Sequence, residues 1–216
     1  MPIAASTGPS ADQLSLKLPV PENGPLYLPP DAPPLDDEAL GALCAANPDL
    51  SIERTAEGGL IVMAPAYSRS GFQSGEVFGQ LRSWALRDGT GVAFDSSAGF
   101  RLPGGRAMRA PDACWVRRSR LAALSEKARA GFLPLCPDFL IEVGSPSDRL
   151  ADLQNKMREY RAAGLRLGWL IHPGDRGVEI WTPEETKMLA NPATITAGPP
   201  VAGFILDLAA IWEPPF

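Results

Sequence analysis

Two acidic residues lie on strands that the sequence predicts to be buried, where a carboxylate needs a compensating partner. Asp112 stands at the start of a segment that continues to Val116, and Glu142 lies near the far end of the apolar segment 138–143. A carboxylate on a buried strand is normally protonated, paired with a base or bound to a metal ion. If the two strands are neighbours, both acids can hold one hard divalent cation. Spacing alone leaves open the alternative that each acid forms a separate salt bridge with an arginine.

Two further charged residues are candidates for the same site. Lys156 lies beside the apolar stripe of a predicted helix that follows directly from the Glu142 strand, so its ammonium group can fold back toward that strand. A lysine near a metal-bound water can orient the water and stabilise negative charge that develops on a phosphate. The alternative is a lysine whose stem covers apolar surface while its charge stays in solvent. Glu76 lies within an earlier predicted helix, and its position alone also fits a solvated helix-face glutamate.

Histidine and cysteine offer little chemistry in this chain. It has one histidine, His172, and three widely spaced cysteines, so a two-histidine zinc site is excluded and the cysteines form no zinc motif. A catalytic pair of Cys114 as nucleophile and His172 as base is disfavoured, because a buried cysteine usually acts as a small hydrophobic residue. The glycine pair at 104–105 indicates a turn rather than a phosphate-binding loop.

The composition is that of a globular protein. The 216 residues are 45% hydrophobic and 21% charged, which suffices to bury a substantial core. No segment approaches the roughly 18 apolar residues that a membrane-spanning helix needs, and the first residues lack the features of a secretory signal. The odd, dispersed cysteines form no disulfide framework. We therefore expect a soluble, cytoplasmic protein that does not contact membranes.

The charge is unevenly distributed along the chain. The formal net charge is −5, which argues against indiscriminate coating of nucleic acid. Residues 101–187 nevertheless carry 15 Lys and Arg against 11 acids, whereas the rest of the chain carries 5 against 14. A polyanionic substrate is therefore compatible with the second half of the chain. Solvated helix faces would account for the same distribution.

Two regions differ in composition. Nine of the first 36 residues are prolines, and this stretch has a single aromatic residue, Tyr27. Such a segment does not form a packed core, so residues 1–35 are predicted to be an extended or mobile arm. Residues 36–216 are predicted to form one domain.

The predicted domain contains both helical and strand patterns. Helices are expected at 36–47, 71–87, 118–130 and from about 148 to Gly164, with a last strand and a short helix near 206–212. The other expected strands are 50–54, 59–63, 91–94, 99–102, 110–116, 138–143, 166–171 and 178–182. This pattern predicts an α/β (α+β) fold in which helices flank a mixed β-sheet.

Several sequence blocks, taken in order, resemble a known family. They are Pro111-Asp112, Pro137-Asp138-Phe139-Leu140-Ile141-Glu142-Val143, Ser145-Pro146-Ser147-Asp148, Lys156-Met157-Arg158-Glu159-Tyr160, Ala163-Gly164, Gly168-Trp169-Leu170-Ile171 and Gly203-Phe204. Together they resemble the Uma-two family, a bacterial group of proposed endonucleases in the restriction-endonuclease-like PD-(D/E)XK superfamily. The resemblance covers roughly residues 36–213 and implies the restriction-endonuclease-like fold.

The resemblance also implies roles for individual residues. Asp112 corresponds to the aspartate of the PD element and Glu142 to the acid of the second element. Both would ligate Mg²⁺, for which Mn²⁺ could substitute, together with the main-chain carbonyl of Val143. Glu76 corresponds to the acid that the superfamily often places on its early helix, where it would serve as an outer ligand or water anchor.

The chain departs from the superfamily pattern at two positions. The lysine expected two residues after the second acid is replaced by Gly144. In this family the lysine is supplied from the following helix, which here makes it Lys156. Where relatives often have Trp-Leu-Ile-Asp-Pro, this chain has His172 before Pro173, a change expected to alter a loop rather than the metal site.

The implied activity is that of a Mg²⁺-dependent endonuclease that hydrolyses DNA phosphodiester bonds. Because cutting both strands of a duplex usually requires two sites, a homodimer is expected. A second hypothesis is a catalytically lapsed nuclease-like module that binds DNA or a protein partner without cutting. The acidic balance and the missing in-strand lysine favour that alternative, since a fold can persist after its chemistry is lost.

Overall fold

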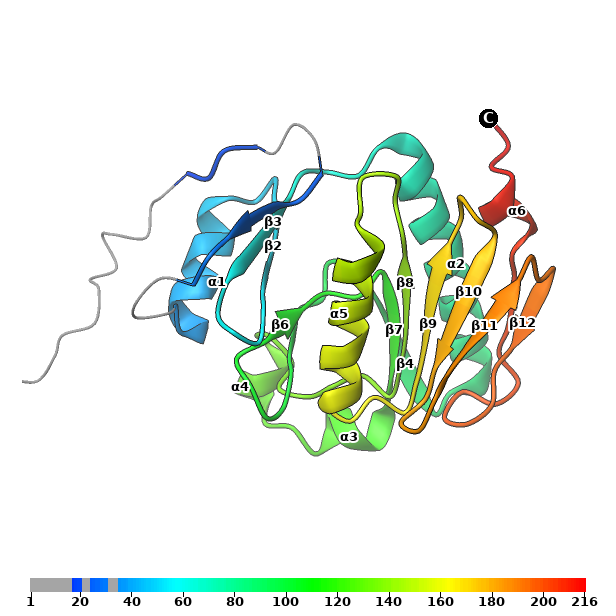
Figure 1. Ribbon diagram of the computed structural model, residues 1–216. Coiled ribbons are helices and arrows are strands. Elements are labelled where there is room, and N and C mark those ends of the chain that lie inside the picture. The colour runs from blue at the N-terminus through cyan, green and yellow to red at the C-terminus, as the bar shows by residue number, and fades with distance from the viewer. Residues whose placement is uncertain (1–16, 21–23, 31–34) are drawn as a thin grey trace, which may run out of the picture.

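The fold of the computed structural model consists of a larger six-stranded β-sheet, a smaller five-stranded sheet, a two-stranded sheet and the helices around them (Figure 1). It describes residues 17–20, 24–30 and 35–216. Of the predicted arm 1–35, residues 1–16, 21–23 and 31–34 therefore lie outside the described residues. No helix in the described ranges is both long and apolar enough to cross a membrane.

The helices are α1 (Asp37–Ala46), α2 (Ser68–Asp88), α3 (Arg118–Ala122), α4 (Glu126–Arg129), α5 (Leu150–Ala162) and α6 (Ala209–Trp212). The strands are β1 (Leu26–Leu28), β2 (Ser51–Arg54), β3 (Leu60–Met63), β4 (Gly91–Asp95), β5 (Phe100–Arg101), β6 (Met108–Arg109), β7 (Ala113–Arg117), β8 (Phe139–Val143), β9 (Leu167–His172), β10 (Gly177–Trp181), β11 (Thr186–Ala190), β12 (Thr194–Thr196) and β13 (Ile205–Asp207).

The larger sheet is mixed, as the sequence predicts. Its strand order is β11-β10-β9-β8-β7-β4. β8 and β9 are parallel, and the other neighbours are antiparallel. Parallel neighbours need a crossover connection, and α5 provides it between β8 and β9. The predicted fold class, a mixed sheet flanked by helices, is confirmed.

α2 and α5 cover opposite faces of this sheet. Alternate residues of a strand point to opposite faces. Trp115 of β7 and Ile141 of β8 belong to the apolar cluster that contains α2, whereas Cys114 and Leu140 belong to the cluster that contains α5. Glu142 alternates with Ile141, so its side chain lies on the α5 face, where the candidate site is found.

The smaller sheet brings the N-terminal part of the chain next to α5 (Figure 1). Its strand order is β1-β3-β2-β6-β5, and α1 packs on it through Leu40 and Leu43. The strand β1, which lies within the predicted arm, pairs with β3 from Leu26 to Leu28. The sequence analysis assigned no structure there, because three residues between prolines carry no recognisable strand pattern.

Most predicted elements form close to their expected bounds, and the two longest helices, α2 and α5, end close to a glycine. Gly89 and Gly164 both adopt positive φ just after α2 and α5, a conformation that glycine adopts without steric cost. The buried Leu165 follows Gly164 as expected.

Other expectations about the elements are wrong. The helix expected over 118–130 is two short helices, because Ser125 caps the start of α4 by accepting from the N–H of Ala128 at 3.2 Å. The segment Ser145–Asp148 does not cap α5. Asp148 instead accepts from the N–H and hydroxyl groups of Ser145, and α5 begins after Arg149. The strands β6, β11 and β12 were not expected.

Candidate active site

Asp112 and Glu142 lie at the same end of two neighbouring strands. The register of β7 with β8, continued by one residue beyond Ala113, sets Asp112 opposite Glu142. The main-chain N–H of Val143 donates to Asp112 Oδ2 at 2.8 Å, and the Ser74 hydroxyl donates to Oδ1 at 3.1 Å. The structure thus brings together two acids that are 30 residues apart in the sequence.

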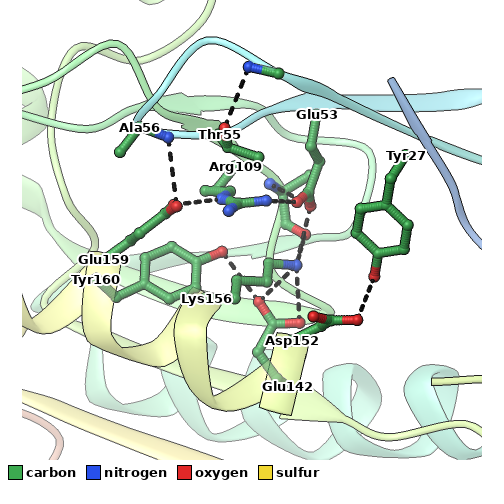
Figure 2. Close-up of polar contacts among 12 residues, drawn as sticks. Tyr27, Glu53, Thr55, Ala56, Arg109, Glu142, Asp152, Lys156, Glu159 and Tyr160 are labelled. Atoms are coloured by element: carbon green, nitrogen blue, oxygen red, sulfur yellow. Dashed lines mark hydrogen bonds and ion pairs between the residues drawn. The ribbon is translucent and has the colours of Figure 1, made fainter. Parts of the chain in front are cut away.

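The ammonium group of Lys156 lies at the centre of the cluster (Figure 2). Its Nζ is 2.9 Å from Glu142 Oε1 and 3.0 Å from Oε2. It also donates to Glu53 Oε1 at 2.9 Å and to the Ala110 carbonyl at 3.2 Å. The side chain is only 13% exposed, so it folds back onto β8 instead of reaching into solvent. Among the ion pairs of the described residues, neither Asp112 nor Glu142 has an arginine partner.

Glu53 joins the cluster from β2, in the smaller sheet, and the sequence analysis missed it. Its side chain is 2% exposed and accepts from Lys156, from Arg109 Nη1 at 2.9 Å and from the N–H of Ala110 at 3.0 Å. The available signal was weak: Glu53 follows Ile52 on a predicted strand, so it is a third strand acid. The polar composition of Ser51–Arg54 gives no sign that this side chain is buried.

Further residues of the cluster hold these groups in place (Figure 2). Arg109 of β6 bridges two carboxylates, because its Nε also donates to Glu159 Oε2 at 2.7 Å. The hydroxyl of Tyr160, which is fully buried, donates to Glu142 Oε1 at 3.0 Å. Glu159 and Tyr160 lie three and four residues after Lys156 on α5, so one face of this helix makes all three contacts with the two sheets.

Glu76 is not brought into this cluster. Its carboxylate accepts from Gln80 Nε2 at 3.1 Å, one turn further along α2. With Gln80 and Arg87 it lines a groove between α2 and the segment that contains Gly203 and Ile205. Ser74, two residues earlier, contacts Asp112. Residues two apart on a helix point in different directions, and no hydrogen bond or ion pair found in the described residues links Glu76 to the site.

Burial and charge divide the acids of the cluster into two kinds. Burial raises the pKa of Glu142 to about 8, with further increases from the charges of Asp112 and Glu53 that Lys156 only partly offsets. Burial also raises the pKa of Asp112. At Glu53 burial is outweighed by Lys156 and Arg109, and the pKa is lowered. Glu53 therefore holds its charge firmly, whereas the charges of Asp112 and Glu142 are incompletely compensated.

The base in the cluster responds in the opposite sense. Burial alone would lower the pKa of Lys156, but the carboxylates of Glu142 and Glu53 outweigh it and raise the pKa above its ordinary value. Lys156 is therefore a permanent cation at neutral pH.

The raised pKa of Glu142 predicts a pH-dependent stability of the metal-free protein. Between its ordinary pKa and about 8, folded Glu142 keeps a proton that the unfolded chain releases. The free energy of unfolding should therefore fall as pH rises across this window, by at most about 1.4 kcal/mol per pH unit. Urea unfolding in EDTA at several pH values measures the slope, and Glu142→Gln should flatten it. If the free energy of unfolding of Glu142→Gln fell equally steeply with pH, the pH dependence would arise from other titratable groups. Glu53, with its lowered pKa, contributes only at more acidic pH.

The donor set suits a hard divalent cation. The cluster contains four carboxylates and two bases, namely those of Glu53, Asp112, Glu142, Glu159, Lys156 and Arg109. Among the described residues no group of three or more His, Cys, Asp or Glu side chains is arranged to coordinate a metal ion. Mg²⁺ is usually held by only one or two carboxylates and keeps several waters. The incompletely compensated pair Asp112 and Glu142 therefore fits Mg²⁺.

His172 and Cys114 lie outside this cluster. His172 Nε2 is 3.1 Å from Glu179 Oε1 on the neighbouring strand β10. Cys114 is fully buried in β7, and burial raises the pKa of its thiol well above the ordinary value. No hydrogen bond among the described residues joins Cys114 to His172, so the structure offers no support for a nucleophile pair.

Comparisons with known proteins agree with this architecture. The chain is similar to a solved structure described as "a putative nuclease belonging to DUF820 from Anabaena variabilis ATCC 29413", with 20% sequence identity and a TM-score of 0.62. The match covers 75% of this chain and 89% of that one. No curated protein matches the chain. Residues 37–209 match the model of the Uma2 family, described as "Putative restriction endonuclease". The chain therefore belongs to the Uma2 family, the family that its sequence blocks resemble.

Proposed function

We propose that this protein is a metal-dependent endonuclease that hydrolyses DNA phosphodiester bonds. The observation that carries the proposal is the convergence of Asp112, Glu142 and Lys156 at one end of neighbouring strands. Membership of a family described by nuclease activity supports the reaction class.

Asp112 and Glu142 would hold Mg²⁺ or Mn²⁺, with the main-chain carbonyl of Val143 as a third oxygen ligand. The N–H of Val143 faces Asp112, and the N–H and C=O of one strand residue point toward the same neighbouring strand. The carbonyl of Val143 is thus on the side of the aspartate. A cation held there would polarise a phosphoryl oxygen and lower the pKa of a bound water.

Lys156 is the group that acts on water and phosphate in this proposal. Its permanent positive charge would orient the attacking water and offset negative charge that develops on the phosphate. Tyr160 and Ser74 keep the two acids in place through their hydroxyl groups. Glu76, expected from the family resemblance to be an outer ligand or water anchor, has no contact in the described residues that supports this role.

Nicking of supercoiled plasmid DNA tests the proposal. Wild type should nick in Mg²⁺ or Mn²⁺ and not in EDTA. Glu142→Gln should slow nicking by more than about 100-fold, the upper end of the losses seen for partners of metal ligands. Glu179→Gln is the matched control: Glu179 is an equally buried strand glutamate whose partners are Gln154, His172 and Trp181. It should keep the wild-type rate.

Two other results would point elsewhere. If wild type and Glu142→Gln nicked DNA at the same rate, the active site would lie elsewhere or the activity would come from a contaminating nuclease. Metal-independent DNA binding by a wild type that does not nick in any cation would favour the non-catalytic module. The homodimer expected for double-strand cutting stays a prediction.

A further inference from the structure

All hydrogen-bond donors of Lys156 are already in use. An ammonium group has three N–H donors, and here they meet Glu142, Glu53 and the carbonyl of Ala110. A lysine that orients an attacking water must have a donor free for that water. The arrangement in the structure is therefore a resting one, and one of the three contacts must open before Lys156 can act.

The contact between Lys156 and Glu142 is the one that conflicts with cation binding. Lys156 Nζ lies within 3.0 Å of both of its oxygens, and Tyr160 also donates to Oε1. A divalent cation that binds Glu142 would face a like charge at the same carboxylate. Like charges at such separations repel strongly in a buried site.

Glu53 can keep the lysine when Glu142 is given up. Its carboxylate is 2% exposed and is fixed by Arg109 and by the N–H of Ala110. Its Oε1 is 2.9 Å from Lys156 Nζ. An ammonium group that leaves Glu142 thus retains a buried, charged partner and the Ala110 carbonyl.

We infer that Lys156 is the resident countercharge of Glu142 when this carboxylate is ionised, and that a divalent cation binds by displacing the ammonium group of Lys156 from Glu142 onto Glu53. The displacement frees one N–H of Lys156 for water or phosphate. Glu53 is then a positioning residue that acts through Lys156 and does not ligate the cation. The inference rests on the proposed function, because it concerns the same cation site.

Mn²⁺ affinity, measured by calorimetry and electron paramagnetic resonance without DNA, tests this exchange. The proteins are wild type, Lys156→Met, Glu53→Gln and the double variant. Affinities are taken from the alkaline plateau, where protons no longer compete for the carboxylates. Lys156→Met should bind Mn²⁺ at least about tenfold more tightly, because the competing charge is gone. Glu53→Gln should bind about tenfold more weakly, a loss typical of outer partners.

The double variant separates positioning from ligation. If Glu53 acts only through Lys156, Glu53→Gln has no effect once Lys156 is methionine. An equal loss in both backgrounds would make Glu53 a ligand and overturn its positioning role. Lys187→Met, which removes an exposed lysine paired with Glu185, is the matched control and should leave the affinity unchanged.

The other outcomes are also decisive. If wild type binds Mn²⁺ and Lys156→Met binds it no better, the exchange is overturned while the proposed metal site stands. If neither protein binds Mn²⁺, the metal site itself fails, and the exchange fails with it. Tight binding by Lys156→Met alone would support the exchange. Urea unfolding of each variant establishes that it is folded, and a Glu53→Gln protein that does not fold leaves the Lys156→Met comparison decisive.

Discussion

Replacing Asp112 by asparagine should abolish metal-dependent cleavage without lowering the stability of the protein. The side chain keeps its shape and loses only its charge. Burial raises the pKa of Asp112 and is only partly offset by Lys156. The folded protein therefore tolerates the charged form poorly, and a neutral amide removes that burden. We expect the nicking rate to fall by more than about 100-fold and the melting temperature to stay the same or rise.

The hydrogen bonds of Asp112 can accommodate an amide. The N–H of Val143 requires an acceptor, and the amide oxygen of asparagine can take the place of Oδ2. The hydroxyl of Ser74 can reverse and accept from the amide nitrogen, because a hydroxyl is both donor and acceptor. The substitution thus separates loss of charge from loss of structure.

Asp138→Asn is the matched control and should show the opposite pattern. Asp138 is also a buried aspartate beside β7, where it accepts from the N–H of Arg117 and pairs with Arg120 at 3.0 Å. Its replacement should lower stability, because a charge-assisted hydrogen bond is lost, and should leave nicking intact. Thermal unfolding and plasmid nicking of both variants provide the two measurements. A stable Asp112→Asn that still nicks at the wild-type rate would remove Asp112 from the site.

Local sequence patterns made Glu142 and Lys156 candidates for one site, and the resemblance to the Uma-two family supplied the roles expected of them. Glu142 stands out because every other residue of β8 is apolar, so its charge is conspicuous on a buried strand. Lys156 follows from the helix that begins seven residues after β8, since a crossover helix must pack back on the same sheet. Asp112 and Glu142 then meet because β7 and β8 are neighbours.

Glu53 could not be predicted in the same way, because its burial is a tertiary effect. It is 103 residues from Lys156 in the sequence. The segment Ser51–Arg54 is short and polar, and it reads as a solvated strand until the smaller sheet is placed beside α5. Arg109 could not be predicted as a site residue either, because β6 is only two residues long and shows no strand pattern in the sequence. These contacts depend on how the sheets meet, which no local period encodes.

The errors in the fold have a similar origin. β11 was missed because its side chains are mostly exposed at a sheet edge, so they show no apolar alternation. The helix over 118–130 has the composition of one helix, yet Ser125 starts a second one because its hydroxyl competes as a cap. Runs of apolar residues predicted the buried central strands well. Elements at the edge of the core were less predictable, because their side chains are mostly exposed.

Replacing Arg109 by methionine should cause a large loss of stability. Arg109 is 3% exposed and is the only link that joins Glu53 and Glu159 directly among the ion pairs of the described residues. Removing it leaves two carboxylates, one of them fully enclosed, with less positive charge nearby. Breaking a buried ion pair by deleting one partner typically costs about 3–5 kcal/mol. We expect a decrease of that order in the free energy of unfolding, measured in urea.

An exposed pair offers the contrast for Arg109. Arg176 and Glu213 form an ion pair at 2.8 Å with side chains that are 44% and 74% exposed. Arg176→Met should therefore change the free energy of unfolding by no more than about 1 kcal/mol. If Arg109→Met cost no more than this control, the buried network would not be what holds the smaller sheet against α5.

A second substitution tests why Arg109 matters. If the loss arises from uncompensated charge, adding Glu159→Gln to Arg109→Met should restore part of the stability, because one of the abandoned carboxylates becomes neutral. If the loss arises from the missing side-chain volume, the double variant should be no more stable than Arg109→Met. Recovery would mean that α5 and the smaller sheet are held together by charge balance, the same balance that keeps Glu53 beside Lys156.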